Sequence, residues 1–208
     1  MDKENNTKSD AALIGPSDPA PFELLNPSSE KPMLLVCDHA SKAVPSGMDN
    51  LGLDEATMDL HVGWDIGAAE VARRLAKDLN CMAGLAGYSR LVIDNNRQPG
   101  DPTGIPAASD DIIIPGNQDL SEAEQIARTD QFFWPYHHAI TEAIAHLWRN
   151  GLPPAVFSVH TFTPSMNGED RLWHIGVLWN RDPRMAEPLI QKLRDHGEGF
   201  HVGDNQPY

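Results

Sequence analysis

The sequence predicts an α/β fold: a three-layer sandwich with a largely parallel or mixed central sheet and helices on both faces. Segments typical of buried strands alternate along the chain with segments of helical periodicity, and this order is typical of α/β folds. The chain has 208 residues, a length that fits one domain and can bury a substantial core. We therefore expect a single domain over 32–208. Residues 1–31, rich in proline and polar residues, are expected to form a flexible tail or a surface strap.

Apolar patterning gives the order of the elements. The segments with strand character are 33–37, 91–93, 155–160 and 175–178. The first of them is a continuous apolar run, typical of a strand buried on both faces. Helical spacing of apolar residues marks 65–79, 121–150 and 183–195, with Ser121 and Glu124 as a capping box and Gly151 as the end of the second helix. A long Pro/Gly-rich loop is expected over 98–120, and loops of this length are usually functional or mobile.

The charge balance excludes several kinds of partner. Acidic residues number 30 against 16 basic ones, and the net charge of −14 repels nucleic acid and anionic membranes. Only Cys37 and Cys81 are present, which favours buried free thiols over a disulfide framework. Neither a signal peptide nor an apolar run of ~18 residues is found. We therefore expect a cytoplasmic protein with a small-molecule substrate, no nucleic-acid or membrane partner, and an oligomeric state that the sequence leaves open.

Two of the predicted strands end in a histidine. His39 follows the strand over 33–37, and His160 closes the strand over 155–160. If the two strands are parallel neighbours, their carboxyl ends meet at one edge of the sheet, where ligands of open α/β sheets bind. Two imidazoles and a carboxylate make a three-ligand open zinc site. A lone histidine more often has only a structural role, but the matching positions favour a divalent metal, with zinc as the expected ion.

The third ligand of this site is open between several residues. Asp65 is our choice, with Asp38 and His61 as alternatives. His61 precedes Asp65 by four residues, a spacing that brings both to one face if the segment is helical. Asp65 also suits the start of the helical segment, so a helix cap explains it as well, and His61 is then a surface residue.

Candidate substrate-binding residues follow in two places. Arg90, Asn96 and Arg97 surround a predicted strand end, and arginine is suited to bidentate capture of a carboxylate, to which an asparagine adds a neutral hydrogen bond. The pattern is explained equally well by a structural ion pair between Arg90 and Asp94, with Arg97 exposed to solvent. Arg171 and His174 precede a further strand and either bind substrate or belong to the loop.

Several enzyme classes lack their motifs here. The sequence contains no G-x-S-x-G elbow, no P-loop and no G-x-G-x-x-G after a strand. This argues against a serine hydrolase of the α/β type, an NTPase and a dinucleotide enzyme.

Five motifs resemble, in sequence and in order, those of the N-formylglutamate amidohydrolase family. They are 37–41, 61–67, 88–97, 158–164 and 173–180. The resemblance implies a fold similar to that of the zinc exopeptidases and of the aspartoacylase and succinylglutamate desuccinylase group, whose members cleave an amide and hold the substrate carboxylate with an Asn-Arg pair. By that resemblance, His39 and His160 match the two histidine ligands, and Asn96 with Arg97 matches the carboxylate clamp.

The resemblance also implies a reaction. This is metal-dependent cleavage of the acyl amide of an N-acyl acidic amino acid, with N-formyl-L-glutamate giving L-glutamate and formate. The metal polarises the acyl carbonyl, while Arg97 with Arg90 or Arg171 fixes the substrate carboxylates. The exopeptidases place a glutamate ligand three residues after the first histidine, where this chain has Lys42, so Asp65 is the substitute.

The general base is the part of the family pattern that we cannot assign. In the related enzymes a glutamate of a further C-terminal segment is the base, and we expect it to lie in a segment that the given sequence lacks. The catalytic residue therefore stays unknown. The alternative to an active amidohydrolase is a catalytically impaired relative that binds a metal or a ligand.

Overall fold

The computed structural model describes residues 12–149, 151–166, 169–196 and 199–206, and the chain divides into two compact units, Met1–Phe162 and Thr163–Tyr208. The first unit contains β1 (Phe22–Leu25), β2 (Met33–Cys37), η1 (Ser46–Gly52), α1 (Glu55–Met58), α2 (Ala68–Leu79), β3 (Met82–Ala86), β4 (Ala108–Ser109), β5 (Ile112–Ile113), η2 (Pro115–Asn117), α3 (Glu122–Arg128), η3 (Thr129–Phe133), α4 (Trp134–Trp148) and β6 (Ala155–Ser158). The second unit contains β7 (Ser165–Met166), β8 (Glu169–Asp170), β9 (Ile175–Val177), α5 (Pro183–Asp195) and β10 (Val202–Asp204). Within the described residues, no helix is long and apolar enough to cross a membrane.

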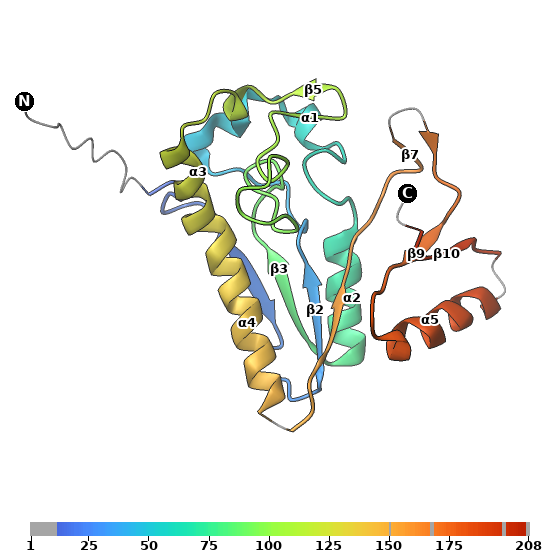
Figure 1. The fold of residues 1–208 in the computed structure, drawn as a ribbon. Coiled ribbons are helices and arrows are strands. Elements are labelled where there is room, and N and C mark those ends of the chain that lie inside the picture. Colours follow the sequence, from blue (N-terminus) through green and yellow to red (C-terminus); the bar gives the residue numbers. More distant parts are fainter. Residues whose placement is uncertain (1–11, 150, 167–168, 197–198, 207–208) are drawn as a thin grey trace, which may run out of the picture. The chain divides into compact units, whose positions relative to one another are not determined.

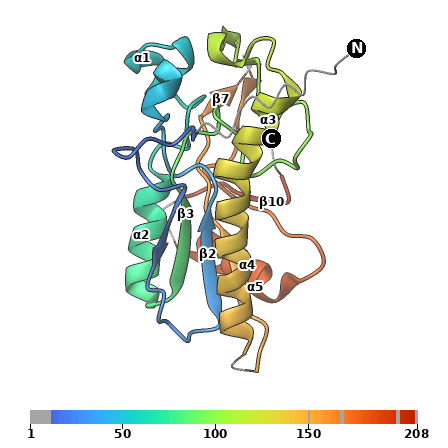
Figure 2. The ribbon, with the colours of Figure 1, turned by 90° about the vertical axis from the view of Figure 1, so that its left-hand side faces the viewer.

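The centre of the first unit is a four-stranded mixed sheet in the order β1-β3-β2-β6. Strands β3, β2 and β6 run parallel, and β1 runs antiparallel to β3. In both Figure 1 and Figure 2, β2 and β3 lie between α2 and α4, so the sheet is covered by a helix on each face. The predicted three-layer α/β sandwich with a mixed sheet is therefore confirmed.

The side chains of β2 alternate between two cores. Leu35 and Cys37 pack with the alanines of α2 on one face of the sheet, whereas Leu34 and Val36 pack against α4 on the other. Because both faces are covered, the strand is apolar throughout, as expected for a strand of a buried parallel sheet. Cys37 and Cys81 are free and buried thiols, as the sequence predicts.

Helix α2 begins three residues later than the predicted helix over 65–79. Its N-cap is Gly67, which has a φ of 83° and offers no side-chain cap. The interpretation of Asp65 as a helix cap is therefore wrong, and the Asp65 carboxylate has other partners. A glycine is suited to this position because only glycine adopts a positive φ without steric cost.

The strand predicted over 91–93 is not formed. These residues are buried, but Leu91 and Val92 lie in a turn, in which the Val92 N–H donates to the Ser89 carbonyl at 3.0 Å. An apolar run indicates burial and does not by itself separate a strand from a buried loop. The strand that precedes this turn, β3, has the sequence MAGLA, in which alanine and glycine give little strand signal.

The long helix predicted over 121–150 forms as three consecutive segments. Ser121 and Glu124 make the predicted capping box at the start of α3. The middle segment, η3, is a π-helix, which widens one turn of the helix and changes the direction of the side chains that follow. Helix α4 then runs to Trp148, and Gly151 follows with a φ of 105°.

The second unit is a small α/β arrangement of its own. Strands β9 and β10 pair in parallel, and α5 packs against them through an apolar cluster that contains Val177, Ile190 and Val202. The predicted strand over 175–178 and the predicted helix over 183–195 both form, with bounds within one residue of those expected.

The segment over 1–31 contributes a strand to the sheet. Strand β1 pairs with β3 from Phe22 opposite Ala86 to Leu25 opposite Ala83. Residues 1–11 of the expected tail lie outside the described residues.

The core between the sheet and α2 gives a first prediction. Leu35 is fully buried (0% exposed), and Leu35→Ala is expected to lower the free energy of unfolding by about 2–5 kcal/mol, because truncation leaves a cavity under α2. The control is Leu152→Ala, at a side chain that is 69% exposed, which should change it by less than ~0.5 kcal/mol. Urea titrations followed by circular dichroism measure both. Equal effects in the two variants would contradict the assignment of Leu35 to the core.

Candidate metal centre

The parallel register of β2 and β6 brings the two histidines together. Val36 is paired with Ser158, and Asp38 and His160 each lie two residues beyond that pair. The register therefore places them level with each other at the carboxyl edge of the sheet, as the strand-end pattern predicts. His39 follows Asp38, and its ring centroid is 5.0 Å from that of His160.

Asp65 lies between the two imidazoles. Its Oδ2 is 2.9 Å from Nδ1 of His160, and its Oδ1 is 3.4 Å from Nδ1 of His39. The backbone N–H of Asp65 donates to the His39 carbonyl at 3.0 Å, so the loop before α2 is fixed to the end of β2. One ligand atom from each of the three side chains lies within 4.8 Å of the others, and this cluster could hold a metal ion.

The other ring nitrogen of each histidine faces a second carboxylate. His39 Nε2 is 2.7 Å from Asp94 Oδ1, and His160 Nε2 is 3.4 Å from Asp38 Oδ2. Metal-binding histidines usually direct their remaining N–H to such a group, which fixes the ring and its tautomer. Nδ1 of His39 is buried and makes no hydrogen bond with the described residues. The donor set therefore fits a metal of the kind bound by two histidines and a carboxylate.

Arg90 connects two of these carboxylates. Its Nη1 is 3.3 Å from Asp65 Oδ1, and its Nη2 is 3.1 Å from Asp94 Oδ2. The ion pair of Arg90 with Asp94, which was the alternative to a role in substrate binding, is thus present. The side chain is 29% exposed, and its role in substrate binding stays a prediction.

The charged groups of the cluster stabilise one another. Burial would raise the pKa of Asp65, but the hydrogen bond with His160 and the nearby His39 ring hold that pKa well below its ordinary value. The pKa of Asp94 is likewise lowered, against burial, to about 2 by its bond to His39. Burial disfavours protonation of His160, but its hydrogen bonds to Asp38 and Asp65 outweigh burial and raise its pKa to about 9. The carboxylates are thus ionised at neutral pH, and a metal that binds here displaces protons from imidazole.

The other candidates for the third ligand occupy different positions. His61 lies beside Asp110, with 3.0 Å between Nε2 and Oδ2, and is not part of the cluster. Asp38 faces Nε2 of His160, on the side of the ring opposite Nδ1. Among the three candidates, Asp65 alone contacts the Nδ1 atoms of both histidines.

The predicted clamp begins two residues after Asp94. The Asp94 carboxylate accepts the backbone N–H of Asn96 at 2.8 Å, and the Asp94 carbonyl accepts that of Arg97 at 3.1 Å. The aspartate that holds His39 therefore also fixes the start of the clamp. Both clamp side chains are exposed.

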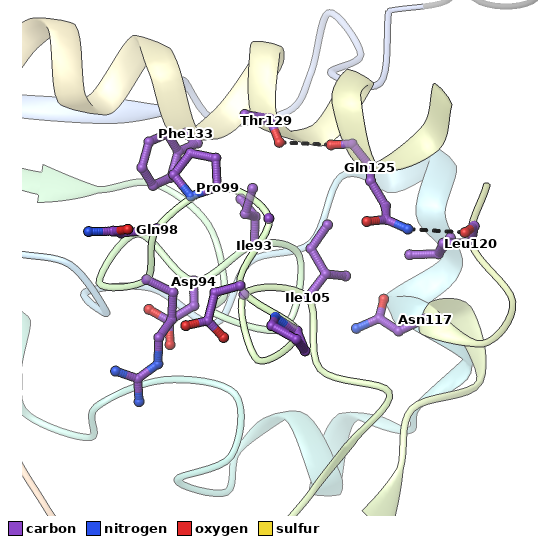
Figure 3. A pocket seen from close by; sticks show the side chains of 15 residues that line it. Ile93, Asp94, Gln98, Pro99, Ile105, Asn117, Leu120, Gln125, Thr129 and Phe133 are labelled. Atoms are coloured by element: carbon purple, nitrogen blue, oxygen red, sulfur yellow. Dashed lines mark hydrogen bonds between the residues drawn. The ribbon is translucent and has the colours of Figure 1, made fainter. Parts of the chain in front are cut away.

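A cavity of about 230 Å³ is lined in part by Asp94, the aspartate that contacts His39. Asp94 and Arg97 line it together with residues of α3 and η3, and Figure 3 shows it from close by. On the helical side, Thr129 donates to the Gln125 carbonyl, and the Gln125 amide donates to the Leu120 carbonyl (Figure 3). Asp94 connects this cavity to the cluster, because it lines the cavity and its carboxylate also contacts His39.

Comparison with known proteins identifies the family. The family model for N-formylglutamate amidohydrolase matches residues 31–208. The chain belongs to the N-formylglutamate amidohydrolase family. It is therefore a hydrolase that acts on amides, as the motifs predict.

Two solved structures are similar to this amidohydrolase. The gene product Atu2144 from Agrobacterium tumefaciens is 35% identical, with a TM-score of 0.88 over 94% of this chain and 77% of that one. The N-formylglutamate amidohydrolase from Ralstonia eutropha JMP134 is 22% identical, with a TM-score of 0.71 over 91% of this chain and 77% of that one; at this identity the likeness shows the fold. A comparison with curated proteins found no match.

Two further predicted substrate-binding residues of the amidohydrolase lie in its second unit. The Arg171 N–H donates to the Pro164 carbonyl at 2.8 Å. Nδ1 of His174 accepts the His201 N–H at 2.9 Å. Their roles in substrate binding stay predictions.

Two polar residues around the cluster are missed by sequence reasoning. Helical periodicity explains Tyr136 as a core residue of α4, yet its hydroxyl donates to Asp38 Oδ1 at 2.7 Å. Ser158 ends β6, and its hydroxyl oxygen is 3.0 Å from His160 Nε2. The signal available for Tyr136 is that a buried tyrosine hydroxyl needs a hydrogen-bond partner.

A buried arginine supports the segment that carries Asp94. Arg128 is 4% exposed, and its Nη1 donates to the Val92 carbonyl at 3.1 Å and to the Asn117 side chain at 2.7 Å. The Asn117 amide in turn donates to the Leu91 carbonyl at 2.9 Å. Burial lowers the pKa of Arg128 to about 10, so the guanidinium remains charged at neutral pH and keeps its donors.

This support gives a second prediction. Arg128→Met should lower the free energy of unfolding by about 3 kcal/mol, because it leaves several buried acceptors without a donor. Arg149→Met, at the exposed end of α4, is the control and should cost less than ~1 kcal/mol. Thermal and urea unfolding measure the difference. A similar, small loss of unfolding free energy in both variants would mean that Arg128 does not support the segment that carries Asp94.

Proposed function

We propose that this amidohydrolase removes the acyl group from an N-acyl acidic amino acid at a zinc ion held by His39, Asp65 and His160. The proposed substrate is N-formyl-L-glutamate, and the products are L-glutamate and formate. One observation carries the proposal: two imidazoles and a carboxylate meet within 4.8 Å, and each imidazole also faces a second carboxylate. Imidazole and carboxylate donors suit zinc, and three protein ligands leave a position for water or substrate.

The chain's own residues hold this donor set in place. A bound zinc ion supplies a Lewis acid that polarises an amide carbonyl and makes water more acidic. Asp94 holds His39 and Asp38 holds His160, so that Nδ1 of each ring faces Asp65. Arg90 bonds to both Asp65 and Asp94 and so fixes the Asp65 carboxylate. Little rearrangement is then needed when the metal binds, which favours binding.

The substrate is held by cationic and amide groups beside the cavity. The chain as a whole is strongly acidic, so an anionic substrate depends on local positive charge. Arg97 lines the cavity, and Asn96 precedes it on the same turn. A guanidinium and an amide can bind a carboxylate through several hydrogen bonds at once, and this orients the acyl group for attack.

A second candidate function follows from the carboxylates of the cluster. Asp38, Asp65 and Asp94 each contact a histidine, so all three help to hold the donor set in place. The alternative is therefore a relative that binds metal or ligand with impaired turnover.

Zinc content and formate release test the proposal together. The zinc-loaded protein should bind one equivalent of zinc and release formate from N-formyl-L-glutamate. His39→Ala and His160→Ala should each lose at least ~100-fold in zinc affinity, because two protein ligands then remain. His61→Ala, at a histidine paired with Asp110, is the matched control and should keep both properties. Chelator competition measures the affinity, and a formate assay measures turnover.

The two possible failures of this test have different meanings. If the His39 and His160 variants bind zinc like the unsubstituted protein, the metal site is wrong. If zinc binds at one equivalent but no N-acyl amino acid is hydrolysed, the second candidate function is favoured.

The clamp gives a prediction that concerns substrate alone. Arg97→Met should raise the KM for N-formyl-L-glutamate about 10–100-fold, because a charge-assisted hydrogen bond is lost, and zinc content should stay unchanged. Arg149→Met, at the exposed end of α4, serves as the control with an unchanged KM. Steady-state kinetics at saturating zinc measure this. An unchanged KM in the Arg97 variant would exclude Arg97 from the clamp.

A further inference from the structure

Asp38 lies behind His160, on the side of the imidazole that faces away from Asp65. Its Oδ2 is 3.4 Å from His160 Nε2. The Ser158 hydroxyl oxygen is 3.0 Å from the same Nε2 and 3.4 Å from the same Oδ2. A hydroxyl can accept from the ring N–H and donate to a carboxylate. The direct contact and the contact through Ser158 therefore both end on Asp38 Oδ2.

The other oxygen of Asp38 is held by Tyr136. The Tyr136 hydroxyl donates to Oδ1 at 2.7 Å, and the tyrosine is 1% exposed. A carboxylate that follows a strand can rotate about its side-chain bonds unless hydrogen bonds fix it. The strong, buried bond from Tyr136 fixes this rotation and thereby fixes where Oδ2 meets His160.

The position of Tyr136 follows from the π-helical segment before it. Segment η3 ends at Phe133, and α4 begins at Trp134. One extra residue in a helical turn rotates everything that follows by about 100° relative to an uninterrupted α-helix. In this orientation the first turn of α4 makes two contacts near the site. Tyr136 bonds to Asp38, and His137 Nε2 is 2.9 Å from the carbonyl of Asn95, which precedes the clamp. π-helical turns of this kind are often found at functional sites.

We propose that Tyr136 is a positioning residue of the metal centre, which acts through Asp38 to hold His160 in the orientation that binds metal. The proposal rests on the zinc site proposed above. The Tyr136 hydroxyl bonds to Asp38 and not to His39, Asp65 or His160, so its effect on the metal passes through Asp38. Loss of such an outer hydrogen bond commonly weakens metal binding 10–100-fold.

A purely structural role for the buried hydroxyl is the competing explanation, and the chain offers a matched control. Tyr88 is also buried, at 3% exposed, and its hydroxyl donates to the Pro19 carbonyl, away from the cluster. Tyr88→Phe and Tyr136→Phe therefore delete the same buried group. A structural role predicts that both variants lose stability and keep their zinc affinity.

The experiment compares zinc affinity, melting temperature, kcat and KM in the two variants and in the unsubstituted protein. Tyr136→Phe should weaken zinc binding about 10–100-fold in a chelator competition and leave the KM for N-formyl-L-glutamate unchanged at saturating zinc. Tyr88→Phe should keep the zinc affinity of the unsubstituted protein. The proposal is overturned if Tyr136→Phe binds zinc as tightly as the unsubstituted protein, or if both variants weaken it equally.

A second variant tests the connection through Asp38 and guards against misfolding of the first. Asp38→Asn keeps the shape of the side chain, removes its charge, and should also weaken zinc binding about 10–100-fold. The double variant Asp38→Asn/Tyr136→Phe should be no weaker than Asp38→Asn alone, because both changes remove one connected path. If Asp38→Asn binds zinc normally, or if the two losses multiply, the connection fails. An unsubstituted protein that binds no zinc would instead contradict the metal site itself.

Discussion

Strands β2 and β6 run parallel in a single register, and the arrangement of the site depends on this pairing. It sets Asp38 level with His160 and places His39 next to them, two to three residues after the last paired positions. A slip of β6 against β2 by one residue would no longer place His160 level with Asp38, because side chains alternate along a strand. The register is itself held by the two cores, since Leu34 and Leu35 are each fully buried on opposite faces of β2. The packing that stabilises the sheet therefore also positions the candidate ligands.

The site concentrates negative charge in a chain that is already acidic. Three aspartates surround two imidazoles and one guanidinium, in the contacts of Asp38, Asp65 and Asp94. Without a metal, the carboxylates are balanced by Arg90 and by protons on the histidines, which explains why the pKa of His160 is raised to about 9 against its burial. A divalent ion can replace those protons. Metal and protons therefore compete for one buried set of groups.

The sequence predicts the parts of this fold that are strongly patterned. Strand β2 is a continuous apolar run between a proline and an aspartate, and its bounds are predicted to the residue. Ser121 and Glu124 make a capping box that a local rule can identify. Strand β3 escapes prediction because its small residues carry no periodicity, and residues 91–93 are misread because burial alone resembles a strand. Local pattern thus predicts elements well where it is strong, and fails where packing against distant residues decides.

The same division holds for the site. His39 and His160 can be predicted because each lies two residues beyond the end of a strand, and parallel strand ends meet at one edge of the sheet. The bond between Tyr136 and Asp38 joins residues 98 positions apart, and that of Arg128 with Val92 spans 36, so neither pair can be read from local spacing. Asp65 is ambiguous in the sequence because a helix cap and a metal ligand have the same local pattern. The structure shows that it does not cap α2 and that it contacts both histidines.

The central claim is that two imidazoles and a carboxylate of this chain bind one metal ion. The zinc K-edge X-ray absorption spectrum of the zinc-loaded protein tests it most directly. The account predicts two imidazole nitrogens and oxygen ligands at about 2.0–2.2 Å, and no sulfur at about 2.3 Å. A spectrum with one imidazole or none, or with a sulfur ligand from the neighbouring Cys37, would contradict it.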